Sequence, residues 1–381
     1  MSRLAAIAFW LSAALLAWAQ ALYGPFLALL RRLRGATDPP PSVGADRRPL
    51  VSLVVAAYRE EAVIADKVAD ALALDWPRDR LELIVAVDGG AEAGADATAE
   101  RARAAGADQV LELPRGGKVR AQDAAVRAAS GELLAFSDAN ASWAPDALER
   151  LAARFADPQV GYACGRVRFV SDGGTNQEDA YWRYELWLRA QESALASVTA
   201  GNGAIYAVRP QAYVEVDPVM GHDLSFPSLM VKRGWRAVYA ADAVATEKMV
   251  PTIEGEWRRK RRMMSHAWPI VLRGGLLSPR GYDPLYALMI ASHRLLRYAS
   301  PALHAAIVLS AFAGRRRPVQ RAALAAHAAL LAGALAGGAN RARPLLLARY
   351  YVLTTASLAA GLYDHLRHGT PAGWDAPEGT R

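Results

Sequence analysis

An uncharged stretch near the start of the chain is long enough to cross a membrane. Residues 4–30 contain no Asp, Glu, Lys or Arg, and three arginines follow within residues 31–34. About 20 apolar residues span the hydrocarbon core of a bilayer, whereas the apolar region of a signal peptide, the alternative here, has roughly 7–15. Because basic residues collect on the cytoplasmic side of a span, we predict an uncleaved anchor over residues 1–34 whose C-terminal end faces the cytoplasm.

Three weaker apolar segments in the last third of the chain, with a basic segment before them, predict a C-terminal membrane unit over residues 285–365. The first has 16 uncharged residues, and Arg349 interrupts the last. Arginines occur in the loops on both sides, so charge does not decide the orientation of these spans. Residues 366–381 form a short tail. The apolar segments are Tyr298–Ala313, Ala322–Asn340 and Pro344–Tyr363, and the basic one is Leu285–Tyr298 with His293, Arg294 and Arg297.

The net charge of +8 is unevenly distributed along the chain. Residues 49–250 carry 21 basic and 29 acidic side chains, whereas residues 1–48 carry a net +4 and residues 251–381 a net +12. Basic flanks around an acidic centre fit an anionic membrane surface, and we expect no nucleic-acid partner. A hydrophobic content of 53% excludes a disordered chain. With one cysteine, Cys164, neither an intrachain disulfide nor a Cys-based zinc site is possible.

Strands and helices alternate through the acidic centre. Short apolar runs separated by helical patterns are typical of βαβ units and a mostly parallel sheet, in which ligands bind at the carboxyl ends of the strands. Those ends carry acidic residues at 58–61, 88–90 and 138–140. Neither a G-x-G-x-x-G motif nor a complete P-loop is present, which leaves a nucleotide and metal site built from acidic strand ends. The predicted strands are 50–57, 81–88, 108–113 and 132–138, and the helices run to residue 74 and over 93–105 and 118–129.

Eight short motifs follow one another through this centre. They are VVAAYREE (54–61), VAVDGG (85–90), RGGKVRAQDAA (115–125), FSDANA (136–141), YWRYE (181–185), TAGNGAIYAVRP (199–210), GHDLSFP (221–227) and EWRRKRR (256–262). Their order and spacing resemble those of membrane-bound family 2 glycosyltransferases. The resemblance implies a GT-A fold, a Rossmann-like nucleotide-diphospho-sugar transferase domain, over residues 49–275 between N- and C-terminal transmembrane helices.

The resemblance places the nucleotide of the sugar donor at the ends of the first and second strands. Asp88 is implied to accept hydrogen bonds from the base, while Ala57, Tyr58 and Glu60 line the base and ribose pocket. Lys118 would stand nearby as a fixed positive group. The alternative for Lys118 is a solvated surface side chain.

Asp138 matches the first acid of the family's metal-binding DxD motif, and Asn140 stands in place of the second. The implied cofactor is Mg²⁺ or Mn²⁺, which neutralises the donor diphosphate next to Asp138. Because an amide oxygen brings no charge, we expect weaker metal binding than two acids would give. An ordinary turn after a strand, where Asp is common, is the alternative role for Asp88 and Asp138.

Asp223 falls where the family places its catalytic base, at the start of a helix. A carboxylate there takes the proton of the acceptor hydroxyl while that oxygen attacks the anomeric carbon, in one displacement that inverts the configuration. His222 precedes it where an acid is more common, so a share of the base role for His222 stays open. The alternative for Asp223 is a helix N-cap.

Three further features are assigned through the resemblance. A glycine-containing loop is implied to bind the acceptor, and a basic helix to contact the donor diphosphate or, alternatively, anionic headgroups. An aromatic helix over residues 179–197 would lie at the membrane interface. The QxxRW motif of processive relatives is missing, so long-chain polymerisation is not expected. The residues are Gly201, Asn202 and Gly203 in the loop, Arg258, Arg259 and Arg262 in the basic helix, and Trp182, Tyr184 and Trp187 in the aromatic helix.

Together these features predict an inverting, metal-dependent hexosyltransferase, a multi-pass protein of the inner membrane with a cytoplasmic catalytic domain. The expected partners are a nucleotide-sugar donor, for which a UDP-sugar is favoured, a lipid-linked or polysaccharide acceptor, and membrane lipids. Two alternatives remain open: a polyprenyl-phosphate sugar synthase, and a non-catalytic membrane scaffold that keeps the GT-A fold.

Overall fold

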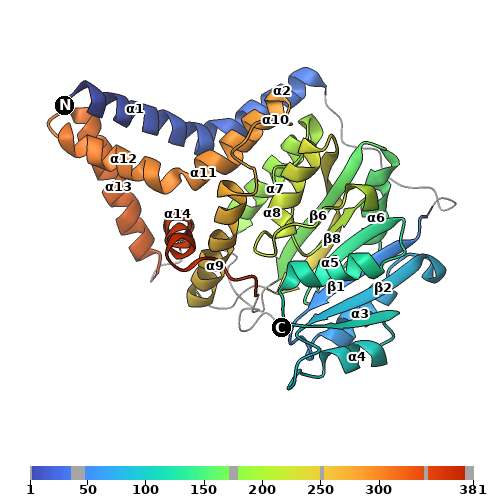
Figure 1. Ribbon diagram of the computed structural model, residues 1–381. Coiled ribbons are helices and arrows are strands. Elements are labelled where there is room, and N and C mark those ends of the chain that lie inside the picture. Colours follow the sequence, from blue (N-terminus) through green and yellow to red (C-terminus); the bar gives the residue numbers. More distant parts are fainter. Residues whose placement is uncertain (1, 36–47, 171–178, 249–252, 339–341, 374–381) are drawn as a thin grey trace.

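The computed structural model describes residues 2–35, 48–170, 179–248, 253–338 and 342–373. An α/β domain lies on one side of the molecule, and the N- and C-terminal helices lie together on the other (Figure 1). This arrangement follows the division of the sequence into an acidic centre and apolar flanks.

A single mixed sheet of eight strands forms the centre of the α/β domain, in the order β3-β2-β1-β4-β7-β6-β8-β5. The first four strands pair in parallel, with Val55 opposite Val85 and Ser137. The mostly apolar sequences of β1, β2 and β4 suit strands that are buried on both faces, whereas β3 is a partly exposed edge strand. The predicted strands are confirmed here. They are β1 (Val51–Ala57), β2 (Leu81–Asp88), β3 (Gln109–Leu113) and β4 (Leu133–Asp138).

The second half of the sheet departs from the parallel pattern. β7 runs antiparallel to both β4 and β6, whereas β6 and β8 pair in parallel. The expectation of a mostly parallel sheet therefore applies to the first half, and the sheet as a whole is mixed. The four strands are β5 (Ser142–Trp143), β6 (Val160–Val170), β7 (Tyr206–Val208) and β8 (Arg236–Lys248).

Helices cover the sheet and support the strand ends. The helix predicted over 93–105 begins later, because Gly89 and Gly94 adopt positive φ angles and the Asp96 carboxylate caps the N–H of Thr98 at 3.2 Å. The helices of the domain are α3 (Ile64–Leu72), α4 (Thr98–Ala104), α5 (Lys118–Ala128), α6 (Ala147–Ala153), α7 (Asp179–Leu195) and α8 (His222–Lys232).

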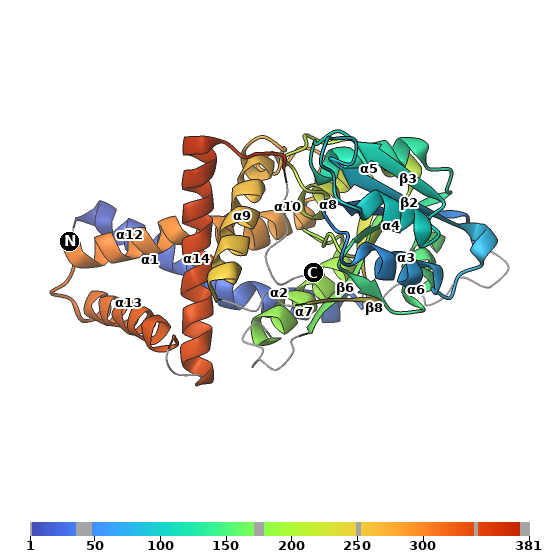
Figure 2. The same cartoon turned by 90° about the horizontal axis from the view of Figure 1, so that it is seen from below.

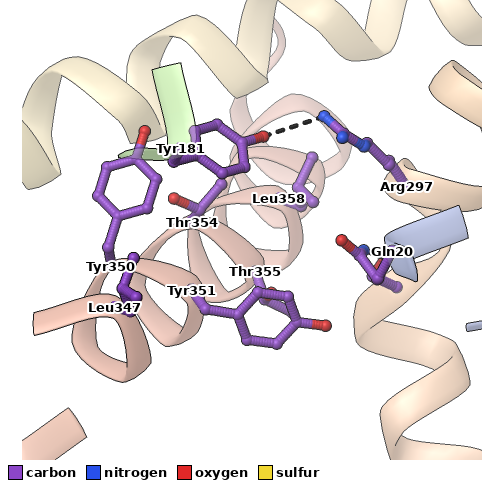
Figure 3. A pocket seen from close by; sticks show the side chains of 10 residues that line it. Gln20, Tyr181, Arg297, Leu347, Tyr350, Tyr351, Thr354, Thr355 and Leu358 are labelled. Atoms are coloured by element: carbon purple, nitrogen blue, oxygen red, sulfur yellow. Dashed lines mark hydrogen bonds between the residues drawn. The ribbon is translucent and has the colours of Figure 1, made fainter. Parts of the chain in front are cut away.

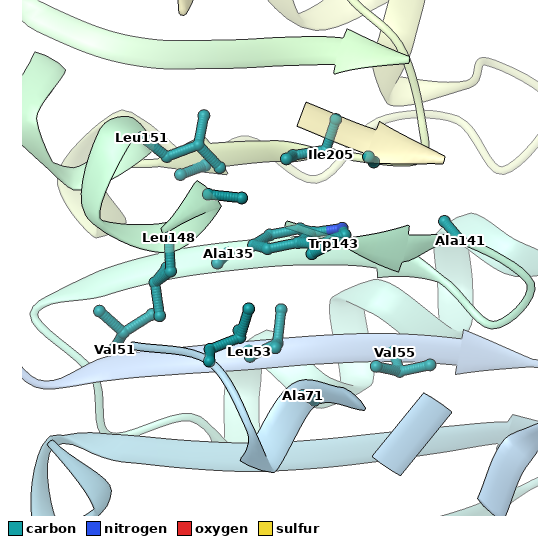
Figure 4. Packing of buried hydrophobic residues seen from close by; sticks show 14 of the residues in the cluster. Val51, Leu53, Val55, Ala71, Ala135, Ala141, Trp143, Leu148, Leu151 and Ile205 are labelled. Atoms are coloured by element: carbon teal, nitrogen blue, oxygen red, sulfur yellow. The ribbon is translucent and has the colours of Figure 1, made fainter. Parts of the chain in front are cut away.

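The core between sheet and helices is built from side chains that alternate along the strands. Leu53 and Val55 of β1 point to the same face as Ala135 of β4, and Trp143 fills the space above them (Figure 4). The indole N–H of Trp143 donates to the carbonyl of Ala204 at 2.9 Å, so its polar atom is satisfied inside the core. This packing fixes the carboxyl ends of β1 and β4 relative to each other.

Three helices among the described residues are long and apolar enough to cross a membrane. One runs from Arg3 to Arg34 through α1 (Arg3–Ala17), a π-helical segment η1 (Trp18–Leu22) and α2 (Tyr23–Arg34). The others are α13 (Pro318–Ala336) and α14 (Arg343–His368). The segment predicted over 298–313 passes the same test together with the helix before it, and the two are bent by 63°. They comprise α10 (Pro284–Met289), η6 (Ile290–Leu295), α11 (Leu296–Tyr298) and α12 (Ser300–Ala313). Asn340, the predicted end of the second segment, lies outside the described residues.

Helix α9 (Ile253–Leu272) lies between the α/β domain and the apolar helices (Figures 1 and 2). It packs along α14, where Arg261 forms an ion pair with Asp364 at 2.6 Å and the Trp268 indole donates to the Leu358 carbonyl at 3.0 Å. Gly361 allows this close approach, since a Cβ there would lie 2.7 Å from the backbone of Ser265. The basic helix is thereby held against the apolar helices.

Candidate active site

Three chain segments meet at the carboxyl end of β4. Asp138 ends that strand, and its Oδ1 forms an ion pair with the Nζ of Lys118, the first residue of α5. Gly203 lies against both groups, because a Cβ there would be 2.9 Å from Lys118 Nζ and 3.4 Å from Asp138 Oδ2. The predicted metal-binding acid, the predicted lysine and the glycine loop are thus brought together, and Lys118 is not a solvated surface side chain.

Negative charge gathers around the Lys118 ammonium. Burial opposes its charge, but Asp138, Asp223 and Glu247 outweigh this effect and raise the pKa of Lys118. Glu247, near the end of β8, is affected in turn: burial and the Asp138 carboxylate raise its pKa to about 7. The site therefore contains several carboxylates, and the nearby cations balance their negative charge only in part.

A second lysine supports the same region from α3. The Nζ of Lys67 donates to the carbonyl of Ala141 at 2.7 Å, which fixes the turn that follows Asp138. Burial lowers the pKa of Lys67 to about 8, against the opposing effect of Asp70, Asp138 and Glu247. The buried Lys67, the half-buried Lys118 and a cluster of acids thus surround the end of β4.

The residues at this position fit a divalent cation with oxygen ligands. Asp138 and Glu247 repel each other electrostatically, as the raised pKa of Glu247 shows, and the amide of Asn140 follows Asp138 by two residues. Among the described residues no group of three or more His, Cys, Asp or Glu forms a complete metal site. Any divalent cation held here would need further oxygen ligands, such as those of a diphosphate.

At the end of β2, Asp88 organises the turn before α5. Its Oδ1 accepts the N–H groups of Gly116 at 2.6 Å and Gly117 at 3.0 Å, and its Oδ2 pairs with Arg115. The Arg115 guanidinium also lies over the ring of Tyr58, 3.3 Å from its centroid. The two side chains predicted to hold the nucleobase are thus adjacent, and Arg115 lies against both.

The other two predicted nucleotide residues lie close by on β1 and the turn after it. Ala57 is the last residue of β1 and is buried. Glu60 is buried as well, and its N–H donates to the hydroxyl of Thr98 at 2.9 Å, which ties the turn to the start of α4. Both residues therefore lie near Tyr58, and their contact with a nucleotide stays a prediction.

The end of the described chain returns to this nucleotide region. We call residues 369–373, which follow α14, the C-terminal strap (Figure 2). Thr370 donates to the carbonyl of Ser265 at 3.0 Å, and His266 Nε2 lies 3.2 Å from the carbonyl of Pro371. The Ala372 carbonyl then lies so close to Gly117 that a Cβ on that glycine would be 2.1 Å away. The strap links α9 and α14 to the turn that Asp88 holds.

Asp223 lies in the first turn of α8, half-buried, and its carbonyl accepts the N–H of Gly201 at 2.6 Å. The N-cap of α8 is Gly221, so Asp223 is not the N-cap residue of this helix. The neighbouring His222 is buried against Phe226, with ring centroids 3.9 Å apart, and its Nδ1 contacts the Tyr206 hydroxyl at 2.9 Å. Burial and Lys118 lower the pKa of His222 to about 3, so its imidazole is neutral at ordinary pH.

The predicted acceptor loop is more tightly packed than expected. A Cβ on Gly201 would lie 1.9 Å from the Tyr162 hydroxyl. This glycine therefore makes room for the Tyr162 side chain and not for an approaching sugar ring. Both ends of the Asn202 amide are used by the backbone, at the Gly165 carbonyl (2.7 Å) and the Ile205 N–H (2.9 Å). These contacts hold the loop in place beside Asp223.

The predicted arginines and aromatic residues of the basic and aromatic helices make different kinds of contact. Arg259 lies over Phe169 at 5.8 Å, and its positive charge partly opposes the rise in the pKa of Glu247, which places it near the acid cluster. Arg258 is exposed and Arg262 is half-buried. On α7, Tyr184 and Trp187 pack against Gly24 of α2, where a Cβ would lie 2.8 Å from each. Packing against the N-terminal helix therefore explains these two aromatic residues.

A cavity of about 240 Å³ lies between α7, α14 and the helices around Arg297 (Figure 3). Arg297 donates to the Tyr181 hydroxyl at 3.0 Å, and the buried Thr354 hydroxyl has no hydrogen-bond partner within the described residues. The surface that lines the cavity is mostly apolar, with a few polar groups such as these among it. Its lining residues are Gln20, Tyr181, Arg297, Ser300, Leu347, Tyr350, Tyr351, Thr354, Thr355 and Leu358.

Sequence reasoning missed Glu247, the contacts of Arg115 and the C-terminal strap. Glu247 lies more than 100 residues after Asp138 and reaches it only through the position of β8 in the sheet. Arg115 was part of a recognised motif, but no local pattern indicates that it covers Tyr58. For the strap no sequence signal was available.

Known proteins resemble this chain over the same region. Residues 52–215 match the model of "Glycosyl transferase family 2". An N-acetylglucosaminyltransferase of Rhizobium leguminosarum bv. viciae is 26% identical over 61% of this chain and 58% of its own length. A beta-monoglucosyldiacylglycerol synthase of Trichormus variabilis is 24% identical over 68% of this chain and 59% of its own length. The chain thus spans just over half the length of these curated relatives.

A solved structure shares the architecture of the whole chain. The mannosyltransferase PcManGT of Pyrobaculum calidifontis, solved with GDP-Man and Mn²⁺, is 25% identical to this chain with a TM-score of 0.73. The similarity covers 96% of this chain and 99% of that one. Together with the family match over residues 52–215, this likeness establishes that the chain carries a family 2 glycosyltransferase domain with the GT-A fold.

Proposed function

We propose that this protein is an inverting, metal-dependent glycosyltransferase that moves a sugar from a nucleotide-sugar to a lipid-linked or polysaccharide acceptor at the cytoplasmic face of the inner membrane. The observation that carries the proposal is that the carboxylates of Asp138 and Asp223 both act on the ammonium group of Lys118. That arrangement supports a site in which Asp138 binds the metal ion, Lys118 supplies a fixed positive charge and Asp223 acts as the base.

Asp223 is proposed to act as the base. Its carboxylate takes the proton of the acceptor hydroxyl as that oxygen bonds to the anomeric carbon and the bond from that carbon to the nucleoside diphosphate breaks. His222 is neutral and buried against Phe226, so we assign the base role to Asp223 alone. A second acid at position 222 is therefore unnecessary for this step.

Asp138 and Asn140 are proposed to hold Mg²⁺ or Mn²⁺, and Glu247, whose pKa the Asp138 carboxylate raises, is a further candidate ligand. When bound, such a cation neutralises the negative charge of the leaving diphosphate. Lys118 and Arg259 are proposed to add fixed positive charge on the protein side. The base and ribose would occupy the region of Ala57, Tyr58, Glu60 and Asp88.

Of the two acceptor classes, we favour the lipid-linked one. The cavity beside Arg297 supports this, because its mostly apolar lining suits a lipid tail and Glu185 already pairs with its one guanidinium. A polyprenyl phosphate is the alternative acceptor. A UDP-sugar is the first candidate donor, and GDP-mannose, present in the mannosyltransferase structure, is the second.

A donor and acceptor screen tests this proposal. Membranes containing the full chain would be incubated with radiolabelled UDP-glucose, UDP-N-acetylglucosamine or GDP-mannose, with Mn²⁺ or EDTA, and lipids would be extracted. We expect one donor to label a lipid fraction in Mn²⁺ but not in EDTA, and Asp223→Asn to abolish the label. Label that is released by mild acid would identify a polyprenyl-phosphate product. Equal signal from the Asp223→Asn variant would contradict the proposal.

A further inference from the structure

A buried group of charged side chains joins the apolar helices to the loop beside Asp223. At its centre is Glu192 on α7, which is fully buried. One of its oxygens accepts the hydroxyl of Tyr23 on α2 at 2.8 Å, and the other accepts the N–H of Thr199 at 3.2 Å and its hydroxyl at 3.0 Å. One carboxylate thus bonds both to the N-terminal helix and to the start of the acceptor loop.

Cations from η6 and α11 balance this buried negative charge. His293 lies between two acids, with Nδ1 2.7 Å from Glu192 and Nε2 3.1 Å from Glu185. Arg297 pairs with Glu185 as well. Burial opposes the ionisation of Glu192, but His293 and Arg294 outweigh it and lower the pKa of that carboxyl. The ionised carboxylate can accept all of its hydrogen bonds.

From Thr199 the connection continues to the proposed base. The Arg294 Nε donates to the Thr199 hydroxyl at 2.9 Å, so this residue is fixed from two sides. Two residues later, the Gly201 N–H donates to the Asp223 carbonyl at 2.6 Å, and Arg189 donates to the Gly201 carbonyl at 3.0 Å. The backbone at Asp223 therefore depends on a loop whose first residue bonds to Glu192.

We propose that Glu192 is a positioning residue for Asp223. Held by Tyr23 and His293, which come from opposite ends of the chain, it fixes Thr199 and thereby sets the backbone position of the base. The catalytic geometry then requires the N-terminal and C-terminal apolar helices to be assembled around α7. This inference rests on the proposed function for the role of Asp223, but the packing relationship does not.

Thr199 offers a matched pair of variants to test this connection. Thr199→Val keeps the shape of the side chain and removes the hydroxyl, whereas Thr199→Ser keeps the hydroxyl. Tyr23→Phe removes one donor to Glu192 without removing the ring. Ser292→Ala serves as the control, because it breaks the 2.8 Å contact from the Trp18 indole to Ser292, next to His293, without touching Glu192.

Hydrogen–deuterium exchange of the purified full chain in detergent gives a measurement that needs no substrate. We expect amide exchange in residues 199–203 to become about tenfold faster in Thr199→Val and Tyr23→Phe, since a hydrogen bond to a charged group is removed in each. Thr199→Ser and Ser292→Ala should stay within about twofold of the wild type. Unchanged exchange in folded Thr199→Val and Tyr23→Phe would overturn the proposal.

Kinetics with a donor found active in the screen separate positioning from general stability. We expect Thr199→Val to lower kcat about tenfold or more, because small displacements of a catalytic group reduce rate strongly. The KM for the donor and the affinity for UDP or GDP should change less than twofold, and Thr199→Ser should recover most of kcat. A parallel loss of nucleotide affinity would contradict a positioning role. If no donor is turned over, the proposed function fails while the exchange experiment still decides this inference.

Discussion

Both carboxylate oxygens of Asp88 lie 3.0 Å from the backbone nitrogen of Gly117. The end of β2 is therefore bonded directly to the turn that starts α5 and carries Lys118. Because Lys118 in turn pairs with Asp138, the predicted nucleotide and metal residues form one connected unit. We therefore expect donor binding to depend on this unit.

Replacement of Asp88 should weaken nucleotide binding and the fold together. Asp88→Ala leaves the N–H groups of Gly116 and Gly117 without their acceptor, which we expect to lower stability by about 1–3 kcal/mol. The affinity for UDP or GDP, measured by calorimetry, should fall about tenfold or more. Glu92→Gln, which alters the other carboxylate that contacts the same turn through Arg115, is the control and should bind nucleotide nearly normally.

Removal of the C-terminal strap should open the nucleotide region. A chain that ends at Gly369 lacks the Ala372 carbonyl that lies against Gly117, next to Asp88. We expect UDP or GDP to associate several-fold faster with this shortened chain, as measured by stopped-flow with a fluorescent nucleotide. Slower or unchanged association would show that the strap does not restrict access.

Asn140→Asp should strengthen metal binding. The substitution adds a charged oxygen ligand two residues after Asp138, where an amide now stands. We expect Mn²⁺ affinity in the presence of UDP or GDP to rise about tenfold in a calorimetric titration, and Asp138→Asn to lower it by at least as much. Equal affinities in all three proteins would rule out this position as the metal site.

We expect His222 to influence how the stability of the protein changes at acidic pH. It should not influence how the rate of sugar transfer changes there. The pKa of His222 is about 3 in the folded chain and near 6.5 when unfolded, so unfolding takes up a proton between these values. The free energy of unfolding therefore falls as pH drops below 6.5, by up to about 1.4 kcal/mol per pH unit.

Thermal melting at pH 7.5 and pH 5 checks this effect. The loss of melting temperature on acidification should be smaller in His222→Gln than in the wild type, because glutamine takes up no proton. The pH at which sugar transfer falls on the acid side should stay where it is. An equal acid sensitivity in both proteins would contradict the buried, neutral histidine.

The sequence predicted the first half of the sheet and the acids at its strand ends, because continuous apolar β-branched runs and the acids that follow them are local patterns. The structure brings Asp138 and Asp223 close to Lys118, and Asp88 bonds to the turn that precedes Lys118; their roles in catalysis stay predictions. The remaining contacts depend on distant segments. Glu247 comes from β8, whose place beside β6 no local pattern indicates, and Glu192 is one charged residue in a helix that reads as amphipathic.

The Asp223→Asn variant tests the central claim most directly. Sugar transfer by membranes containing this variant is compared with the wild type, using the donor found in the screen, while UDP or GDP affinity is measured on the purified proteins. We predict a loss of transfer of about 100-fold or more, the usual contribution of a general base, with nucleotide affinity within about twofold. Full transfer activity in Asp223→Asn would contradict the account.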